Sequence, residues 1–162
     1  MAHEVLAIVQ ARLGSTRLPG KVLKKINGKP LIEILLHRLS QSKKIDKIIL
    51  ATSESSENDS LTQMIEKLGY DVFRGAENDV LGRYFEAAKK YQPKSIVRIT
   101  GDCPIIDRAI IDEVISLYEK EDAENLFYEV QSITTSKQAN DWIAPWPGYA
   151  GTTNCNKIGN QT

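Results

Sequence analysis

The loop ARLGSTRLPGK at residues 11–21 is the stretch of this chain best suited to bind an anion. It contains two arginines, a lysine, a serine, a threonine and two glycines, and it directly follows an apolar run at residues 5–10. Backbone N–H groups of a glycine-rich turn can approach phosphate oxygens, and cationic side chains can neutralise them. The loop is not a Walker A sequence, since five residues separate Gly14 from Gly20 and Val22 follows Lys21. We therefore predict a phosphate-binding loop of another type; the alternative is a turn with incidental charge.

A second candidate is the segment TGDCP at residues 100–104, which follows an apolar run of strand type. The carboxylate of Asp102 therefore lies just after the end of that strand. A carboxylate close to a cationic phosphate loop is a suitable ligand for a Mg²⁺ ion that also binds phosphate oxygens. The alternative is a Gly-Asp turn that caps the next helix. The presence of both segments in one chain favours the magnesium site.

Strand and helix patterns alternate along the first 122 residues, which predicts an α/β fold. We expect strands at residues 5–10, 47–51, 71–73 and 95–100, and helices at residues 31–40, 60–68, 79–91 and 107–118. Ser60 and Gln63 resemble a capping box at the start of the second helix. The alternation predicts a parallel sheet covered by helices on both faces. Ligands bind at the carboxyl ends of such strands, so functional residues should follow each strand directly.

The composition is typical of a soluble globular protein, with 162 residues, 41% of them hydrophobic and 26% charged. The formal net charge is zero, which argues against a nucleic-acid binder that works by bulk electrostatics. Residues 12–47, however, contain ten basic and two acidic residues, a local net charge of +8 that suits a small polyanion such as a nucleotide. A solvated lysine-rich face is the alternative.

Neither Cys103 nor Cys155 has metal-ligand spacing. The first residues form no targeting segment, so a cytoplasmic location is predicted.

The character of the chain changes near residue 122. Five of the last 40 residues are charged, against 37 of the preceding 122. Both tryptophans, Trp142 and Trp146, lie in this segment, which has no sustained periodicity. We therefore divide the chain into a nucleotide-binding domain at residues 1–122 and an unassigned C-terminal tail at residues 123–162.

Four runs resemble the cytidylyltransferases of the spore-coat polysaccharide and acylneuraminate type: IVQARLGSTRLPGKVLKKINGKPLIE, ILATSES, FRGAENDVLGRYFEAA and RITGDCPIID. The resemblance covers about residues 5–122, and its most specific motif is A-R-x-x-S-x-R-x-P-x-K. It implies a Rossmann-like three-layer α/β/α sandwich of the nucleotide-diphospho-sugar transferase type, with a mostly parallel sheet. It also implies transfer of CMP from CTP to an acidic or amino sugar for surface polysaccharide biosynthesis, with release of pyrophosphate. Mg²⁺ would be the cofactor, no nucleic acid or membrane is expected as a partner, and a homodimer is possible.

The resemblance also assigns roles to individual residues. The expected catalytic residues are Arg12, Lys21 and Asp102, and Asp102 is also the expected metal ligand. Within the loop, Arg12, Ser15, Arg17 and Lys21 would hold the triphosphate, while residues 51–53 would line the base and ribose pocket. The full nucleotide-binding set is Ala11, Arg12, Gly14, Ser15, Arg17, Lys21, Ala51, Thr52, Ser53, Arg74, Arg83 and Gly101. For Arg83, a solvated position on a helix surface is the alternative.

Family members carry a second metal-binding acidic residue and elements for sugar binding beyond this region, and no counterpart is recognisable after residue 122. A truncated fragment that binds CTP with little or no turnover is therefore a second hypothesis. A glycosyltransferase of related fold is a third. That class uses an Asp-x-Asp metal motif, whereas the segment TGDCP holds one aspartate only.

Overall fold

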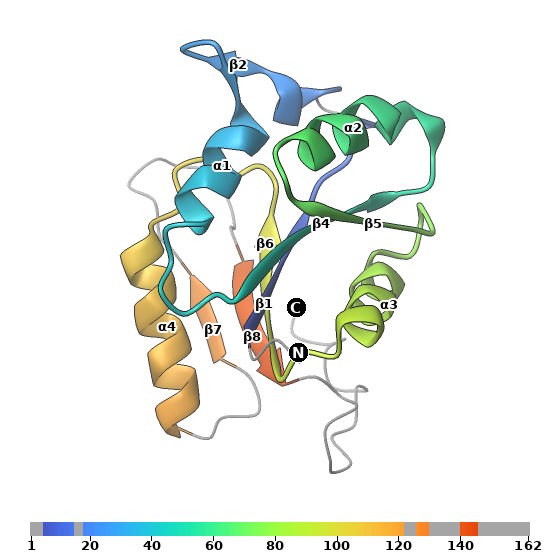
Figure 1. Ribbon diagram of the computed structural model, residues 1–162. Helices are drawn as coiled ribbons and strands as arrows, with labels where there is room; N and C mark the ends of the chain where they lie inside the picture. The colour runs from blue at the N-terminus through green and yellow to red at the C-terminus, as the bar shows by residue number, and fades with distance from the viewer. Residues whose placement is uncertain (1–4, 15–17, 122–125, 130–139, 146–162) are drawn as a thin grey trace.

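A computed structural model describes residues 5–14, 18–121, 126–129 and 140–145. The sheet lies between two layers of helices, with α1, α2 and α4 on one face and α3 on the other (Figure 1). The strands are β1 Val5–Gln10, β2 Lys25–Ile26, β3 Lys29–Pro30, β4 Lys47–Ser53, β5 Asp71–Gly75, β6 Ser95–Thr100, β7 Leu126–Glu129 and β8 Asn140–Pro145. The helices are α1 Leu31–Leu39, α2 Asp59–Lys67, α3 Val80–Tyr91 and α4 Arg108–Glu121, with short 3-10 helices η1 Lys21–Leu23 and η2 Ser56–Asn58.

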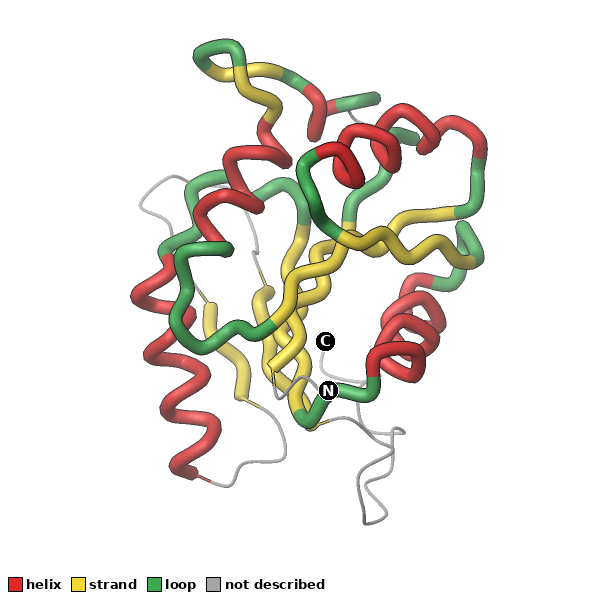
Figure 2. The backbone as a smooth tube through the Cα atoms, in the orientation of Figure 1, coloured by secondary structure: helices red, strands yellow, loops and turns green. Residues whose placement is uncertain are grey.

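The main sheet has six strands in the order β5-β4-β1-β6-β8-β7. The strands β5, β4, β1 and β6 are parallel, and β8 pairs with β6 in the antiparallel direction. Gln10, the last residue of β1, is in register with Ala51 of β4 and Thr100 of β6. The loops that follow these strands therefore leave the sheet side by side at its carboxyl edge, as the strands in Figure 2 show. This confirms the predicted α/β fold with a mostly parallel sheet.

Alternating side chains of the parallel strands pack into two cores. On the face covered by α1, α2 and α4, Val9 and Leu50 pack with apolar residues of the three helices. On the opposite face, Ile8 and Ala51 pack against Tyr84 and its neighbours on α3. Because both faces are covered, the strands are apolar at successive positions instead of alternate ones. This burial fixes the strands from which the carboxyl-edge loops emerge.

The four predicted helix starts agree with the structure to within one residue, but the capping box predicted for one of them is wrong. The side chain of Asp79 accepts a hydrogen bond from the Gly82 N–H at the start of α3, and that of Asp107 accepts from the Ala109 N–H before α4. The capping box predicted for α2 is absent, because that helix begins at Asp59 and Ser60 lies inside it. Asn58 precedes α2 without capping it through its side chain.

The sheet continues beyond the boundary predicted at residue 122. The strands β7 and β8 pair with each other, and β8 pairs with β6. A second feature absent from the sequence prediction is the β2–β3 hairpin, whose turn residues Asn27 and Gly28 have φ angles of +51° and +82°. Among the described residues, no helix is long and apolar enough to cross a membrane. The cytoplasmic location stays a prediction.

Candidate functional site

The loop after β1 is closed on itself at the carboxyl edge of the sheet. The Gly20 N–H donates to the Leu13 carbonyl over 2.9 Å, and Gly20 has a φ of +63°, in the left-handed region that favours glycine. The predicted site residues Ser15 and Arg17 lie outside the described residues. Gly14 is described, and Arg12 is exposed beside it. The described ends of the loop, at Leu13 and Gly20, are therefore joined by a backbone hydrogen bond.

Gly101 brings the ends of β1 and β6 into close contact. Its N–H donates to the Gln10 carbonyl over 2.7 Å, and the Ala11 N–H donates to the Ala51 carbonyl over 3.2 Å. A Cβ atom at residue 101 would lie 2.7 Å from the Ala11 Cβ and 2.9 Å from the Gln10 carbonyl oxygen. Only glycine therefore fits there without moving one of the two strand ends. The predicted residues Ala11 and Gly101 thus set the spacing between the two candidate loops.

The structure brings together the two predicted functional segments, residues 11–21 and 100–104. The Lys21 Nζ lies 2.7 Å from the Asp102 Oδ2, although 81 residues separate them in the chain. The two side chains are 34% and 46% exposed, so a ligand can reach both. Burial raises the pKa of Asp102, but hydrogen bonds with Lys21 and Thr100 outweigh it and bring the pKa below its ordinary value of 3.8. The carboxylate is therefore held ionised next to an ammonium group.

Arg83 is a buried cation at this edge of the sheet. It lies on α3, is 2% exposed, and donates through one terminal nitrogen to the carbonyls of Ala76 and Glu77 in the loop after β5. Its Nε atom is buried and has no hydrogen-bond partner. Burial lowers the pKa of Arg83, and the nearby charge of Arg12 lowers it further. The solvated position considered for Arg83 is therefore wrong: the guanidinium is buried and electrostatically coupled to Arg12.

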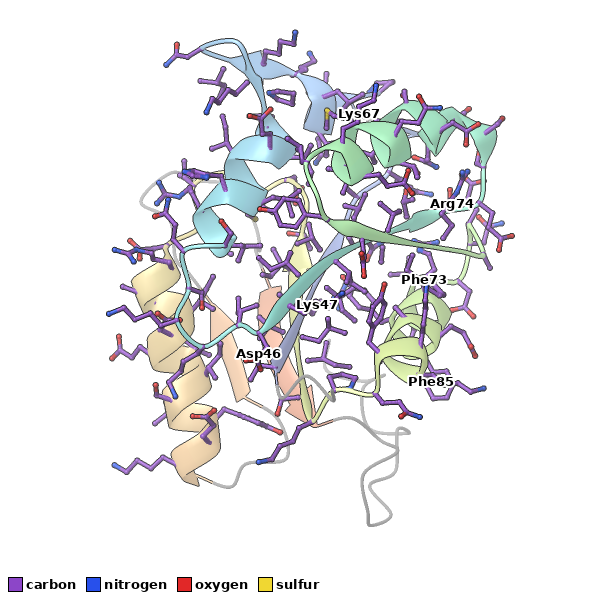
Figure 3. All side chains as sticks on the ribbon, viewed as in Figure 1. Asp46, Lys47, Lys67, Phe73, Arg74 and Phe85 are labelled. Carbon is purple, nitrogen blue, oxygen red and sulfur yellow. The ribbon has the colours of Figure 1, made fainter. Side chains whose placement is uncertain are left out.

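Arg74 is engaged by the loop after β4. Its guanidinium donates to the carbonyls of Glu54 and Ser55 over 2.9 and 3.0 Å, and pairs with the Asp59 carboxylate at 2.7 Å. Figure 3 labels Arg74 on β5, next to α2. In this arrangement Arg74 fixes the shape of residues 54–59, and the structure does not bring it to the Lys21–Asp102 pair.

The end of β4 is the remaining part of the predicted site. Ala51, Thr52 and Ser53 are fully buried, and the Thr52 hydroxyl oxygen has no hydrogen-bond partner. The Ser53 hydroxyl accepts from the side-chain amide of Asn58 over 2.7 Å. The sequence analysis did not select Asn58, although an asparagine between the candidate pocket segment and the start of an amphipathic helix was the available signal.

A magnesium ion fits the donor chemistry of Asp102. Mg²⁺ prefers carboxylate oxygen and is commonly held by one or two carboxylates together with substrate phosphates. No cluster of three or more His, Cys, Asp or Glu side chains suited to a metal occurs within the described part of the chain. A single carboxylate beside the predicted phosphate-binding loop is therefore compatible with an ion that depends on the substrate for its other ligands.

Comparison with known proteins decides the family. A sequence model described as cytidylyltransferase matches residues 6–146. The chain belongs to the cytidylyltransferase family. This confirms the resemblance found in the sequence, and the match extends past residue 122 over both β7 and β8.

Among curated relatives, this cytidylyltransferase chain is 41% identical to the spore coat polysaccharide biosynthesis protein SpsF of Bacillus subtilis, over 72% of the chain and 50% of SpsF. It is 34% identical to 3-deoxy-manno-octulosonate cytidylyltransferase 2 of Hydrogenovibrio crunogenus, over 74% of the chain and 48% of that protein. A solved cytidylyltransferase structure from Leptospira borgpetersenii superposes with a TM-score of 0.76 at 34% identity, covering 90% of this chain and 61% of the other. The chain thus spans about half the length of the curated relatives it matches.

Proposed function

We propose that this protein transfers CMP from CTP to the hydroxyl group of a sugar and releases pyrophosphate. The observation that carries the proposal is the meeting of Lys21 and Asp102 at the carboxyl edge of a cytidylyltransferase sheet. The names of two relatives support the substrate class, since one belongs to spore coat polysaccharide biosynthesis and the other acts as a 3-deoxy-manno-octulosonate cytidylyltransferase. We propose an acidic or amino sugar as the acceptor.

The charges at the site suit this reaction. Attack of a hydroxyl on the α-phosphorus places negative charge on the equatorial oxygens and on the leaving pyrophosphate, so positioning and electrostatic stabilisation supply most of the catalysis. Arg12 is exposed near the start of the loop and Lys21 lies at its end, so the two cations can contact the triphosphate. When Lys21 turns from Asp102 to the phosphates, the carboxylate becomes free to accept other ligands. This proposal assigns the role of general base to neither of the two histidines of the chain, His3 and His37.

Asp102 is the residue we propose to hold Mg²⁺. The ion, when bound, would screen the charge of the phosphate oxygens and the leaving group. Asp102 is suited to this because its carboxylate is ionised at neutral pH and its side chain is 46% exposed. We also propose a homodimer as the working assembly of the complete enzyme.

The length of the chain favours a second candidate function, CTP binding with little or no turnover. Because it spans about half of its curated relatives, a chain that binds CTP but turns it over slowly or not at all is also compatible with the fold. Incubation with CTP, Mg²⁺ and a panel of acidic and amino sugars, followed by measurement of pyrophosphate, separates the two. Sugar-dependent release of pyrophosphate supports the transferase. CTP binding without release supports the binding fragment, and absence of CTP binding contradicts both.

A further inference from the structure

Asn58 connects the candidate phosphate-binding loop to the end of β4. Its Oδ1 accepts a hydrogen bond from the Leu13 N–H over 2.9 Å, and its Nδ2 donates to the Ser53 Oγ over 2.7 Å. Asn58 is 1% exposed and Ser53 is fully buried. A buried amide whose two ends bind two different elements is costly to misplace, because each broken hydrogen bond leaves a buried polar group without a partner.

The side chain of Asn58 is committed to this connection. An asparagine directly before a helix ordinarily accepts a hydrogen bond from an N–H of the first helical turn. Asn58 stands at that position before α2, yet makes no such side-chain bond. Its backbone N–H donates to the Ser55 carbonyl over 3.0 Å, which fixes it within η2. The amide group therefore holds the loop after β1 and does not cap its own helix.

The surroundings of Asn58 are also fixed. Arg74 of β5 binds the carbonyls of Glu54 and Ser55 and the carboxylate of Asp59, on both sides of Asn58 in the chain. The Glu54 N–H donates to the Gly75 carbonyl over 2.9 Å. The segment that carries Asn58 is thus attached to β5 as well as to β4.

Leu13 is the point at which the phosphate-binding loop is held from two directions. Its N–H is bound by Asn58, and its carbonyl is bound by the Gly20 N–H at the other end of the loop. We propose that Asn58 is a positioning residue, which holds the Leu13 backbone, and with it the described start of the predicted phosphate-binding loop, in the position that suits phosphate binding. This inference rests on the proposed function in one respect, namely that the loop binds the triphosphate.

Asn58→Ala tests the inference, with inorganic tripolyphosphate, CTP and cytidine as probes in titration calorimetry. Loss of one positional hydrogen bond predicts a fall of about five- to tenfold in affinity for tripolyphosphate and CTP. Affinity for cytidine, which has no phosphate, should be unchanged. Thr62→Val is the matched control, since Thr62 is a buried polar residue on α2 whose hydroxyl oxygen has no hydrogen-bond partner.

Ser53→Ala and the double variant keep the inference testable if Asn58→Ala unfolds. Ser53→Ala removes the group that orients the amide but leaves the Leu13 bond in place, so a smaller loss of tripolyphosphate affinity is expected. In the double variant the losses should be less than additive, because the two side chains act as one unit. Equal losses for tripolyphosphate and cytidine, or unchanged tripolyphosphate affinity in a folded variant, would overturn the positioning role alone. A wild-type protein that binds neither tripolyphosphate nor CTP would overturn the proposed function together with it.

Discussion

Arg83 is the side chain whose position is best explained by an anionic ligand. Burial of a guanidinium costs free energy unless its charge is paired and its donors are bound. Its partners from the loop after β5 are two neutral carbonyls, its Nε has no hydrogen-bond partner, and Arg12 adds a repulsive charge. An anion bound beside Arg12 would offset this cost. The nucleotide phosphates of the proposed reaction are such an anion.

Replacing Arg83 by methionine should therefore separate stability from binding. We expect Arg83→Met to retain or raise the Tm of the free protein, because the cost of burying the guanidinium, which the carboxylates of Asp79 and Glu77 offset only in part, is removed. Its affinity for CTP should fall by about 1.5 kcal/mol or more, the range for hydrogen bonds to charged groups. Thermal unfolding and titration calorimetry measure the two effects. The control is Lys89→Met, which removes an exposed charge from the same helix and should change neither the Tm nor the CTP affinity. A large fall in Tm with unchanged CTP affinity for Arg83→Met would contradict this account of Arg83.

The ion pair between Lys21 and Asp102 makes a prediction about pH. In the folded protein the pKa of Asp102 lies below 3.8, and Lys21 is a main cause of the lowering. Lys21→Met leaves the opposing effect of burial, so the pKa of Asp102 should rise. An NMR titration of the Asp102 side-chain carboxyl measures this directly. An unchanged pKa would show that the contact does not persist in solution.

The Lys21–Asp102 ion pair also predicts the direction in which the stability of the protein changes with pH. Because the folded-state pKa is lowered, the stabilisation is fully present above pH 3.8 and is lost as the pH falls through the folded-state value. Both side chains are partly exposed, so the effect on the free energy of unfolding should be small. The acid limb of unfolding in Lys21→Met should accordingly lie slightly closer to neutral pH than in the wild type.

Strand ends, more than helices, determine the geometry of the site. The parallel register aligns the ends of β1, β4 and β6, and the close contact at Gly101 fixes how near the loops after β1 and β6 lie. The helices cover the two faces and supply individual groups, such as Arg83 from α3. A change that separates two strand ends should therefore affect ligand binding more than an equally destabilising change elsewhere.

Gly101→Ala and its control Gly69→Ala test whether the contact between strand ends matters for ligand binding. A Cβ atom at residue 101 meets backbone and side-chain atoms of β1 and the residue after it, whereas a Cβ atom at residue 69 meets nothing within 4 Å. Gly69 has a φ of +87°, so its replacement costs stability through backbone strain alone. We expect both variants to lose about 1 to 3 kcal/mol of stability, and only Gly101→Ala to weaken CTP binding. Equal CTP affinities for the two folded variants would contradict the importance of this contact.

Elements with a strong periodic pattern were predictable, and elements defined by pairing were not. The bounds of β1 and β6 agree with the prediction, since buried parallel strands are continuous apolar runs between loop residues. The strands β7 and β8 lack such a pattern and were missed, because they are defined by pairing with each other and with β6. For α2, the sequence suggested a capping box at Ser60, whereas the helix starts at Asp59.

The candidate site likewise contains features that were predictable from the sequence and features that were not. Lys21 and Asp102 were predictable as partners, because the carboxyl ends of neighbouring parallel strands must meet. The burial of Arg83 and the connection through Asn58 were not, since each depends on contacts between residues far apart in the chain. Arg74 shows the converse: the family resemblance suggested a ligand contact, and in the structure its guanidinium binds the carbonyls of the loop after β4.

At the scale of the whole molecule, the aligned carboxyl ends of the parallel strands occur in a chain that spans about half the length of its curated relatives. The family match extends over residues 6–146, so it includes the four parallel strands and also β7 and β8. The sheet is therefore extended on the β6 side by two strands that belong to the matched region. Everything proposed for nucleotide binding lies on the parallel part of this sheet, and the acceptor sugar remains to be identified by the turnover assay.

Titration calorimetry of CTP and CMP against the wild type and Arg12→Ala tests the central claim, that the loop after β1 binds a triphosphate. We expect CTP to bind more tightly than CMP, because the additional phosphates reach the exposed Arg12 and the Lys21 ammonium. Arg12→Ala should weaken CTP binding by about 1.5 to 3 kcal/mol and leave CMP binding nearly unchanged. Equal affinities for CTP and CMP, or equal CTP affinities for the wild type and Arg12→Ala, would contradict the claim.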